Sequence, residues 1–150
     1  FWGDTEGFKR AVSHADSILY LTDNAGEIIF DRLLIELLPA GRVTVAVRGG
    51  AVLNDALLSD AREAGLHEIA KVMDNGTNIA GTVLEECSEE FRKTFSAADL
   101  IISKGQGNFE TLNEASSDIF FLFCVKCQVI QTIVGQPVGT QVLISSSVKA

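Results

Sequence analysis

The sequence predicts an α/β fold in which a three-layer, doubly wound and mainly parallel sheet of the Rossmann-like kind carries helices on both faces. Two observations lead to this fold class. Segments with the character of strands and of helices alternate along the whole chain. The strand segments are continuous apolar runs such as Val43–Val47, which is typical of parallel strands buried on both faces. The order of the strands within the sheet does not follow from the sequence.

The first elements follow from apolar spacing and from the residues that interrupt it. Thr5–Ala15 is predicted as a helix because its apolar residues recur at helical spacing. Ser17–Thr22 is a compact apolar run and is predicted as a buried strand. Glu27–Leu38 has the length of a helix, is nearly apolar all round, and is stopped by Pro39 and Gly41.

Capping and turn residues bound the elements that follow. After the strand Val43–Val47, Asn54 is a natural N-cap for a helix over Asp55–Ala64, and Gly65 ends that helix. Beyond them the expected elements, in chain order, are the strand Ile69–Met73, a helix over Gly81–Ala98 with a break near Cys87–Ser88 as the alternative, the strand Leu100–Ser103, the helix Asn108–Ala115, the strand Ile119–Phe123, the helix Gln128–Val134 and the strand Val142–Ile144.

Length and composition limit the kind of protein. The 150 residues suit one α/β domain over 1–150, with residues 1–16 as a lead-in helix. The 12 Lys and Arg residues against 20 Asp and Glu residues give a net charge of −8, which disfavours a nucleic acid or an anionic membrane surface as partner. The longest apolar run, Ile119–Val125, is too short to span a membrane. Three cysteines are too few for a disulfide framework and indicate a reducing, cytoplasmic setting.

Polar residues collect where the predicted strands end. Parallel α/β sheets bind ligands beyond the carboxyl ends of their strands. Carboxylates and carboxamides with Mg²⁺ or Mn²⁺, next to Lys or Arg, form a site suited to phosphate. The sequence therefore predicts a metal-assisted phosphate site. The segments at the strand ends are Thr22–Glu27, Arg48–Gly50 with Asn54–Asp55, Asp74–Asn78, Ser103–Asn108 and Cys124–Cys127.

Each of these residues also has a purely structural interpretation. Asp23 and Asn24 can simply form a turn, and Asp55 can be a first-turn acid favoured by the helix dipole. Glu27 and Asp31 are four residues apart and can be no more than a polar stripe on a buried helix.

The turn Lys104–Asn108 carries a more specific signal. A glycine-rich turn between a buried strand and a helix directs backbone N–H groups at an anion, with Lys104 beside it. The third glycine of the dinucleotide fingerprint is missing, so NAD is not predicted, and no Walker lysine motif is present either. Cys124 and Cys127 form a lone CxxC pair, which is half a zinc site or a redox dithiol, or two small buried residues.

Three segments resemble the damage-control phosphatase family, formerly a domain of unknown function, and most of all its stand-alone microbial branch. They are Tyr20–Glu27, Val47–Asp55 and Ser103–Glu110, and Phe121–Leu143 also looks like the end of that branch's domain. The resemblance runs in the right order from about Ser17. Family members carry a helical module before the α/β domain. By this resemblance the sequence is expected to start after that module, with residues 1–16 as its remnant.

The resemblance implies a phosphoric monoester hydrolase that depends on a divalent ion (Mg, Mn, Co or Ni) and acts on small phosphorylated metabolites, such as sugar phosphates or damaged phospho-metabolites. It implies Asp23, Asn24 and Asp55 as metal ligands. It implies Lys104 as a phosphate contact, with Gly105, Gly107 and Asn108 in its loop, and Arg48 as a group that contacts either the phosphate or the residues that bind it. Asp23, Asp55 and Lys104 are then the catalytic residues. Water and Asp23 both remain open as the nucleophile.

Two other functions remain open at this point. One is a phospho-metabolite-binding domain without catalysis, which would not need Asp55. The other is a thiol or zinc protein that uses Cys124 and Cys127. A haloacid-dehalogenase phosphatase is disfavoured, because that family has a second Asp two residues after the nucleophile and Ala25 stands at that position.

Overall fold

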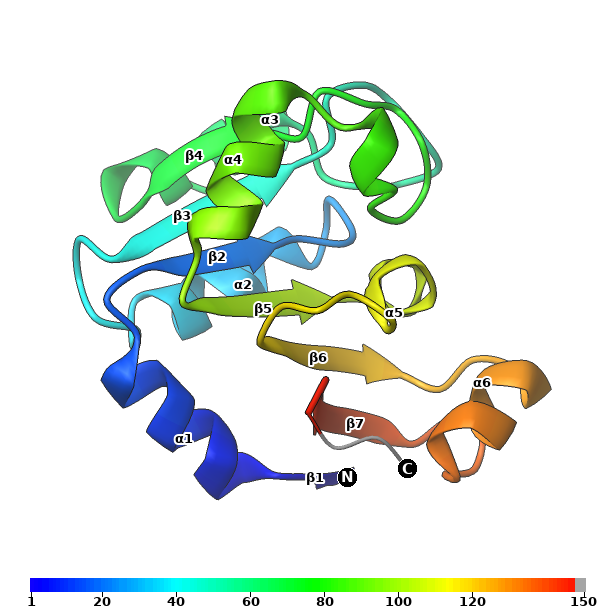
Figure 1. Ribbon diagram of the computed structural model, residues 1–150. Coiled ribbons are helices and arrows are strands. Elements are labelled where there is room, and N and C mark those ends of the chain that lie inside the picture. Colours follow the sequence, from blue (N-terminus) through cyan, green and yellow to red (C-terminus); the bar gives the residue numbers. More distant parts are fainter. Residues whose placement is uncertain (148–150) are drawn as a thin grey trace.

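The computed structural model describes residues 1–147 and consists of one sheet covered by helices on both faces, as Figure 1 shows. The sheet has seven strands in the order β1-β7-β6-β5-β2-β3-β4. All neighbouring strands run parallel except β6 and β7, which are antiparallel. The predicted doubly wound, mainly parallel α/β fold is confirmed. The strands are β1 (Trp2–Gly3), β2 (Ile18–Leu21), β3 (Val43–Val47), β4 (Lys71–Asp74), β5 (Leu100–Lys104), β6 (Ile119–Cys124) and β7 (Gln141–Ser145).

The helices divide between the two faces, and each face has its own apolar core. Residues of α4, α5 and α6 pack on one face, and residues of α1, α2, α3 and η1 pack on the other. The central strands supply both cores in alternation: Ile101 faces the first and Ile102 the second, and both are fully buried. The helical segments are α1 (Thr5–His14), α2 (Ile28–Ile35), α3 (Leu58–Glu63), η1 (Leu66–Glu68), η2 (Leu84–Glu86), α4 (Glu89–Ala97), α5 (Gln106–Leu112) and α6 (Gln128–Val134).

The strand order reverses between β2 and β5. From β2 the chain winds outward through β3 to β4, and it then crosses back to β5, on the other side of β2, and continues to β6. Helices therefore leave the carboxyl ends of β2 and β5 toward opposite faces, which opens a crevice between the two strands. Asp23 follows β2 and Lys104 ends β5, so both lie at this switch point.

The helix predicted over Asp55–Ala64 begins later than expected, and Asn54 is not its N-cap. α3 starts at Leu58, and the Asp60 carboxylate accepts a hydrogen bond from the backbone N–H of Leu57 (2.7 Å). Residues 54–56 bond instead to the loop after β2, because the backbone O of Asn54 accepts from the N–H of Ala25 (2.9 Å). A long-range contact thus replaces a local cap.

Other boundaries also differ from the expectation. The segment Gly81–Ala98 is not one helix: η2 precedes α4, and Ser88 caps α4 by accepting from the N–H of Phe91 (3.2 Å), so the alternative with a break is correct. α5 begins at Gln106 and not at Asn108, and the short β1 was not expected. α2 is nearly apolar all round, as predicted, but only its inner side is buried, and that side includes Asp31. Its exposed apolar residues are Ile29, Phe30 and Leu33, with Leu37 just beyond its end.

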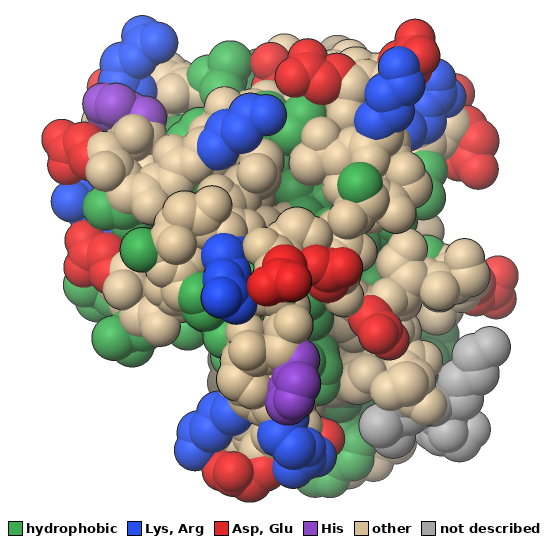
Figure 2. All heavy atoms as spheres, turned by 60° about the vertical axis from the view of Figure 1, so that its left-hand side comes forward, with side chains coloured by type: hydrophobic (Ala, Val, Ile, Leu, Met, Phe, Trp, Pro, Cys, Tyr) green, Lys and Arg blue, Asp and Glu red, His purple; other side chains and the backbone are tan. Residues whose placement is uncertain are grey.

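The surface mixes charges of both signs. Figure 2 shows a face of the molecule on which acidic and basic side chains lie interspersed. Among residues 1–147 no helix has the length and apolar character needed to cross a bilayer.

Candidate active site

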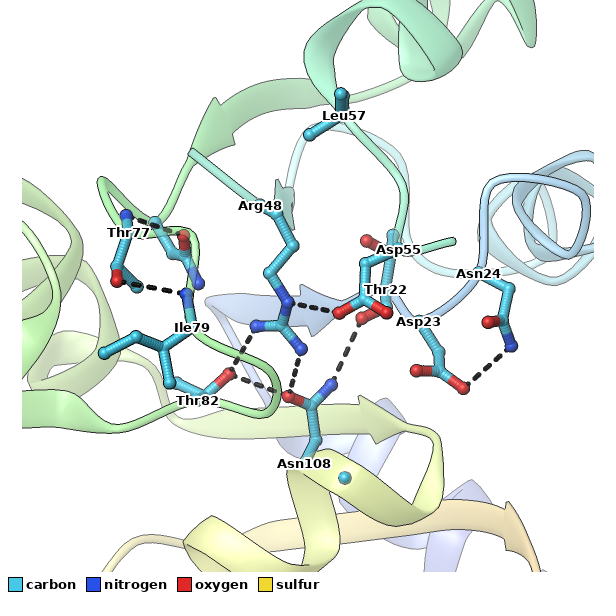
Figure 3. A network of polar contacts seen from close by, with 12 residues as sticks. Thr22, Asp23, Asn24, Arg48, Asp55, Leu57, Thr77, Ile79, Thr82 and Asn108 are labelled. Carbon is cyan, nitrogen blue, oxygen red and sulfur yellow. Dashed lines mark hydrogen bonds and ion pairs between the residues drawn. The ribbon is translucent and has the colours of Figure 1, made fainter. Parts of the chain in front are cut away.

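The loops that follow β2 and β3 are joined by backbone hydrogen bonds. Asn24 and Asp55 form an isolated antiparallel bridge, and the N–H of Ala56 donates to the backbone O of Asp23 (2.8 Å). This pairing brings Asp23, Asn24 and Asp55 together although some thirty residues separate them in the chain, as Figure 3 shows. The three residues predicted as metal ligands are therefore held on a common backbone frame.

Two carboxylates and one carboxamide converge on this frame. Asn24 Nδ2 donates to Asp23 Oδ2 (3.0 Å), and Arg48 Nε donates to Asp55 Oδ2 (2.7 Å). Burial raises the pKa of Asp23, and the negative charges of Asp55 and Glu27 raise it further. A cation between the carboxylates would remove this electrostatic cost.

The donor set fits a hard divalent ion that keeps several waters. Two carboxylates and the oxygen of Asn24 are hard oxygen donors, and Mg²⁺ in particular uses one or two carboxylates plus water and phosphate oxygens. Among residues 1–147 no group of three or more His, Cys, Asp or Glu side chains is placed to hold a metal. On such an ion, water and substrate oxygens would complete the coordination.

Arg48 is a buried residue that links three loops by hydrogen bonds. Its side chain is only 5% exposed, and its guanidinium donates to Asp55, to Thr82 Oγ1 (3.1 Å) and to Asn108 Oδ1 (2.9 Å). Figure 3 shows the guanidinium pointing into this network from the end of β3. In this arrangement Arg48 fixes one oxygen of Asp55 and ties together the segments that follow β3, β4 and β5. It does not line the pocket described below.

The Asn108 side chain has a similar structural task. It is fully buried, and Oδ1 accepts from Arg48 and from Thr82 Oγ1 (2.8 Å). Nδ2 donates to the backbone O of Thr22 (3.1 Å) and of Lys104 (2.8 Å). The side chain therefore connects the ends of β2 and β5 across the switch point and has no N–H left to donate to an anion.

Gly105 and Gly107 of this turn differ in the space that a side chain would find there. Gly105 has φ +82°, and a Cβ at this position would collide with the Asp23 carboxylate. Its N–H donates to the backbone O of Leu122 (3.0 Å), so this amide is not directed at a ligand. A Cβ at Gly107 would make ordinary contact with Gly81. Gly105 thus permits the close approach of Asp23, which is a role distinct from the predicted phosphate contact.

Lys104 ends β5 between Asp31 of α2 and Glu27 of the turn before it. Its ammonium forms ion pairs with Glu27 and with Asp31 Oδ1 (2.6 Å), and its side chain is 12% exposed. Burial lowers the pKa of Lys104, but the charges and hydrogen bonds of Asp31 and Glu27 outweigh it and hold this pKa above its ordinary value. Lys104 is accordingly a fixed positive charge at the switch point.

A pocket of about 450 Å³ opens beside these residues. Its polar wall contains Asp23, Glu27, Lys104, Gly105 and Lys126. Its other wall comes from residues near the ends of the sheet strands: Phe1, Leu122, Phe123, Cys124, Gln141, Val142 and Leu143. Of the three predicted metal ligands, only Asp23 lines this pocket. Asp23 is therefore the residue that places the predicted metal ligands beside Lys104, the predicted phosphate contact.

Sequence reasoning missed two members of this site and undervalued two others. Glu27 and Asp31 contact Lys104 and are more than a polar stripe, and their i, i+4 spacing was the available signal. Tyr20, whose hydroxyl donates to Asp31 (2.8 Å), gave no signal within an apolar strand. Thr82 gave none either, because its partners Arg48 and Asn108 are distant in sequence.

The three cysteines are free thiols. Cys124 lines the pocket, and Cys127 Sγ accepts a long contact from Gln106 Nε2 (3.7 Å). Cys87 is buried in the core next to α4. The arrangement includes no second thiol pair that would complete a zinc site.

Comparisons with known proteins agree with this architecture. A family model described as "Damage-control phosphatase ARMT1-like domain" matches residues 1–142. A damage-control phosphatase of Pyrococcus horikoshii is 41% identical over 150 residues, which cover 97% of this chain and 52% of that protein. A damage-control phosphatase of Archaeoglobus fulgidus is 39% identical over 143 residues, which cover 93% of this chain and 49% of that protein.

Two further similarities complete the comparison. An uncharacterized protein of Methanocaldococcus jannaschii is 47% identical over 133 residues, which cover 85% of this chain and 44% of that protein. The crystal structure of a DUF89 family protein from Pyrococcus horikoshii superposes with a TM-score of 0.92 at 40% identity, over 97% of this chain and 53% of that one. The chain spans about half the length of the curated relatives it matches.

Proposed function

This chain belongs to the ARMT1-like damage-control phosphatase domain family, and on that premise we propose that it hydrolyses phosphoric monoesters of small metabolites with a divalent metal ion (Mg, Mn, Co or Ni). The observation that carries the proposal is the pairing of the two loops, which gathers Asp23, Asn24 and Asp55 at the switch point of the sheet, where Asp23 shares a pocket wall with Lys104. Two relatives carry the printed name damage-control phosphatase.

The proposed metal ligands are Asp23, Asn24 and Asp55. A bound divalent ion would supply positive charge to the phosphoryl oxygens and lower the pKa of a coordinated water. Arg48 holds one oxygen of Asp55 and so leaves Oδ1 for a ligand. Burial raises the pKa of Asp23 and the negative charge of Asp55 raises it further, so a bound cation would offset the cost of ionising Asp23.

Lys104 is the proposed phosphate contact. An ammonium has three N–H donors, and Glu27 and Asp31 take two of them, so one remains for a phosphate oxygen. Lys126 lies on the same pocket wall and adds a second positive charge. Both cations would stabilise the negative charge that develops on the transferring phosphoryl group.

Asp23 is the proposed catalytic carboxylate, since it lies on the pocket wall beside Lys104. Two routes fit this position. Either Asp23 orients a water that attacks phosphorus while the bond to the leaving oxygen breaks, or the Asp23 carboxylate attacks phosphorus as that same bond breaks, and water then hydrolyses the acyl-phosphate to release phosphate and restore Asp23. Hydroxylamine trapping of an acyl-phosphate would distinguish them. Gly105, Gly107 and the N–H of Asn108 complete the proposed phosphate loop, with Gly105 acting through the space it leaves for Asp23.

The proposed substrate is a small phosphorylated metabolite such as a sugar phosphate. A pocket of about 450 Å³ lies in the range of small-molecule sites and not of an extended polymer. We propose the cytoplasm as the place of action, which the three free cysteines support because thiols persist in reducing compartments.

The test is a thermal melt with Mn²⁺, Mg²⁺ or EDTA. An ion at ~100 times its dissociation constant adds ~2.7 kcal/mol to the free energy of unfolding, which raises Tm by roughly 5–10 °C for a chain of this size. We expect this shift in the native chain and its loss in Asp55→Ala and Asp55→Asn. Asp118→Ala, an exposed aspartate just before β6, is the control that should keep the shift.

Activity is measured next, with p-nitrophenyl phosphate and a panel of sugar phosphates. Metal-dependent release of phosphate that is lost in Asp55→Asn is the expected result. A native chain that responds to neither ion contradicts the metal-dependent mechanism. Metal binding without turnover on any phosphate ester would favour a phospho-metabolite-binding domain.

A further inference from the structure

The Asp31 carboxylate lies beneath Lys104 and is almost sealed from solvent. Its side chain is 2% exposed, and Oδ1 accepts hydrogen bonds from Lys104 Nζ (2.6 Å) and Tyr20 Oη (2.8 Å). Tyr20 is itself fully buried in β2. The three side chains come from α2, β2 and β5, so this cluster joins the helix to the two strands that flank the switch point.

Burial of the Asp31 carboxylate has a free-energy cost for the folded protein. An isolated carboxylate in an apolar core is unfavourable, and replacing a buried ion pair by apolar residues is often neutral or stabilising. Asp31 also leaves Oδ2 without a hydrogen-bond partner in the described chain. The remaining buried residues of α2 are Ile28 and Ile35, so the carboxylate interrupts an otherwise apolar inner side.

Glu27 cannot provide the same constraint on Lys104. Its side chain is 35% exposed, and one of its oxygens is within 3.5 Å of Asn24 Nδ2. A lysine carries its charge on a flexible four-carbon stem, so its position depends on the partners that hold it. Asp31, held in turn by Tyr20, is the rigid one of the two partners.

We propose that Asp31 is a positioning residue of the phosphatase site: its buried carboxylate, anchored by the Tyr20 hydroxyl, fixes the Lys104 ammonium at the pocket wall and presents its remaining N–H to the substrate phosphate. This inference rests on the function proposed above. Asp31 does not line the pocket and acts through Lys104 alone.

The charges around Lys104 agree with this assignment. Asp31 and Glu27 contact it from α2 and the turn before it, Asp23 shares the pocket wall after β2, and Lys126 shares it after β6. The two contacting acids hold the ammonium in its charged form against the effect of burial. A phosphate therefore meets a fixed cation whose position is already determined.

The test is a double-mutant cycle on phosphate affinity. Inorganic phosphate is titrated calorimetrically, with 1 mM Mg²⁺ present, into the native chain, Asp31→Asn, Lys104→Met and the double variant. A residue that acts through Lys104 loses its effect once Lys104 is gone. We expect Asp31→Asn to weaken phosphate binding by about tenfold in the native background, in keeping with a charge-assisted contact, and by less than about twofold beside Lys104→Met.

Two further variants make the cycle decisive. Tyr20→Phe removes only the hydroxyl and is expected to weaken binding by about two- to fivefold, again only when Lys104 is present. If Asp31→Asn does not give a folded protein by melting, the same cycle with Tyr20→Phe takes its place. Glu36→Gln, which alters an exposed carboxylate at the C-terminal end of α2, is the matched control and should leave the affinity unchanged.

The possible results separate this inference from the proposed function. Unchanged phosphate affinity in folded Asp31→Asn, or an equal loss in both backgrounds, overturns the positioning role and leaves the phosphatase proposal intact. A native chain that binds no phosphate and cleaves no phosphate ester overturns both.

Discussion

Gly105 lacks a side chain at the point where the Asp23 carboxylate meets the end of β5. We expect Gly105→Ala to reduce the free energy of unfolding by at least about 3 kcal/mol, because the left-handed backbone is strained for alanine and the new Cβ collides with Asp23. Displacement of Asp23 should also abolish the Mn²⁺ or Mg²⁺ shift in Tm. Both effects are read from melts with and without EDTA.

Gly135→Ala provides the comparison for this prediction. Gly135 has φ +72°, but a Cβ there would meet no atom within 4 Å. Its substitution should cost only the backbone strain of about 1–2 kcal/mol and keep the metal shift. Equal losses in the two variants, with the metal shift kept in both, would show that the space beside Asp23 does not matter.

At the scale of elements, Asp99 connects the segments that enter β2 and β5. Its Oδ2 accepts hydrogen bonds from Ser17 Oγ and Ser17 N (both 2.9 Å) and from the N–H of Asp16 (3.1 Å). The bond from the Ser17 hydroxyl, followed by those from the backbone amides, lowers the pKa of Asp99. The ionised carboxylate therefore stabilises the folded state above the unfolded pKa of about 3.9, and this stabilisation is lost as the pH falls through the lower folded value.

The corresponding experiment follows Tm against pH for the native chain and Asp99→Asn. The variant should melt lower at pH 7, and the difference should shrink progressively below about pH 4, where the native carboxylate becomes protonated. Asp118→Asn, at the entry to β6, controls for a general loss of negative charge. A difference that stays constant through the acid range would mean that charge does not matter at this junction.

At the scale of the whole molecule, one sheet unites two apolar cores. Ile101 and Ile102 are neighbours in β5 and face opposite cores. Replacing either by alanine should cost about 2–5 kcal/mol, because both side chains are fully buried. Unfolding should remain a single transition in each variant, since every central strand belongs to both cores. Calorimetry and circular dichroism measure this, and separate transitions for the two faces would contradict it.

The pattern of the sequence determined the fold class and most of the elements. Val43–Val47 and Gln128–Val134 have the bounds that their patterns predict, because a buried strand and a capped helix are encoded by neighbouring residues. The concentration of polar residues at strand ends also followed, since parallel strands bring their carboxyl ends to one edge. The family resemblance of those same segments is confirmed by the match over residues 1–142.

The tertiary structure decided where the polar side chains point. Asn54 does not cap a helix, because its backbone bonds to the loop after β2. The Arg48 side chain points into the protein, where its guanidinium donates hydrogen bonds to Asp55, Thr82 and Asn108. Asp31 became a partner of Lys104 only through the crossover that sets β5 beside β2. These contacts join residues 7 to 73 positions apart. Local periodicity encodes burial, whereas such partners exist only once the strand order is fixed.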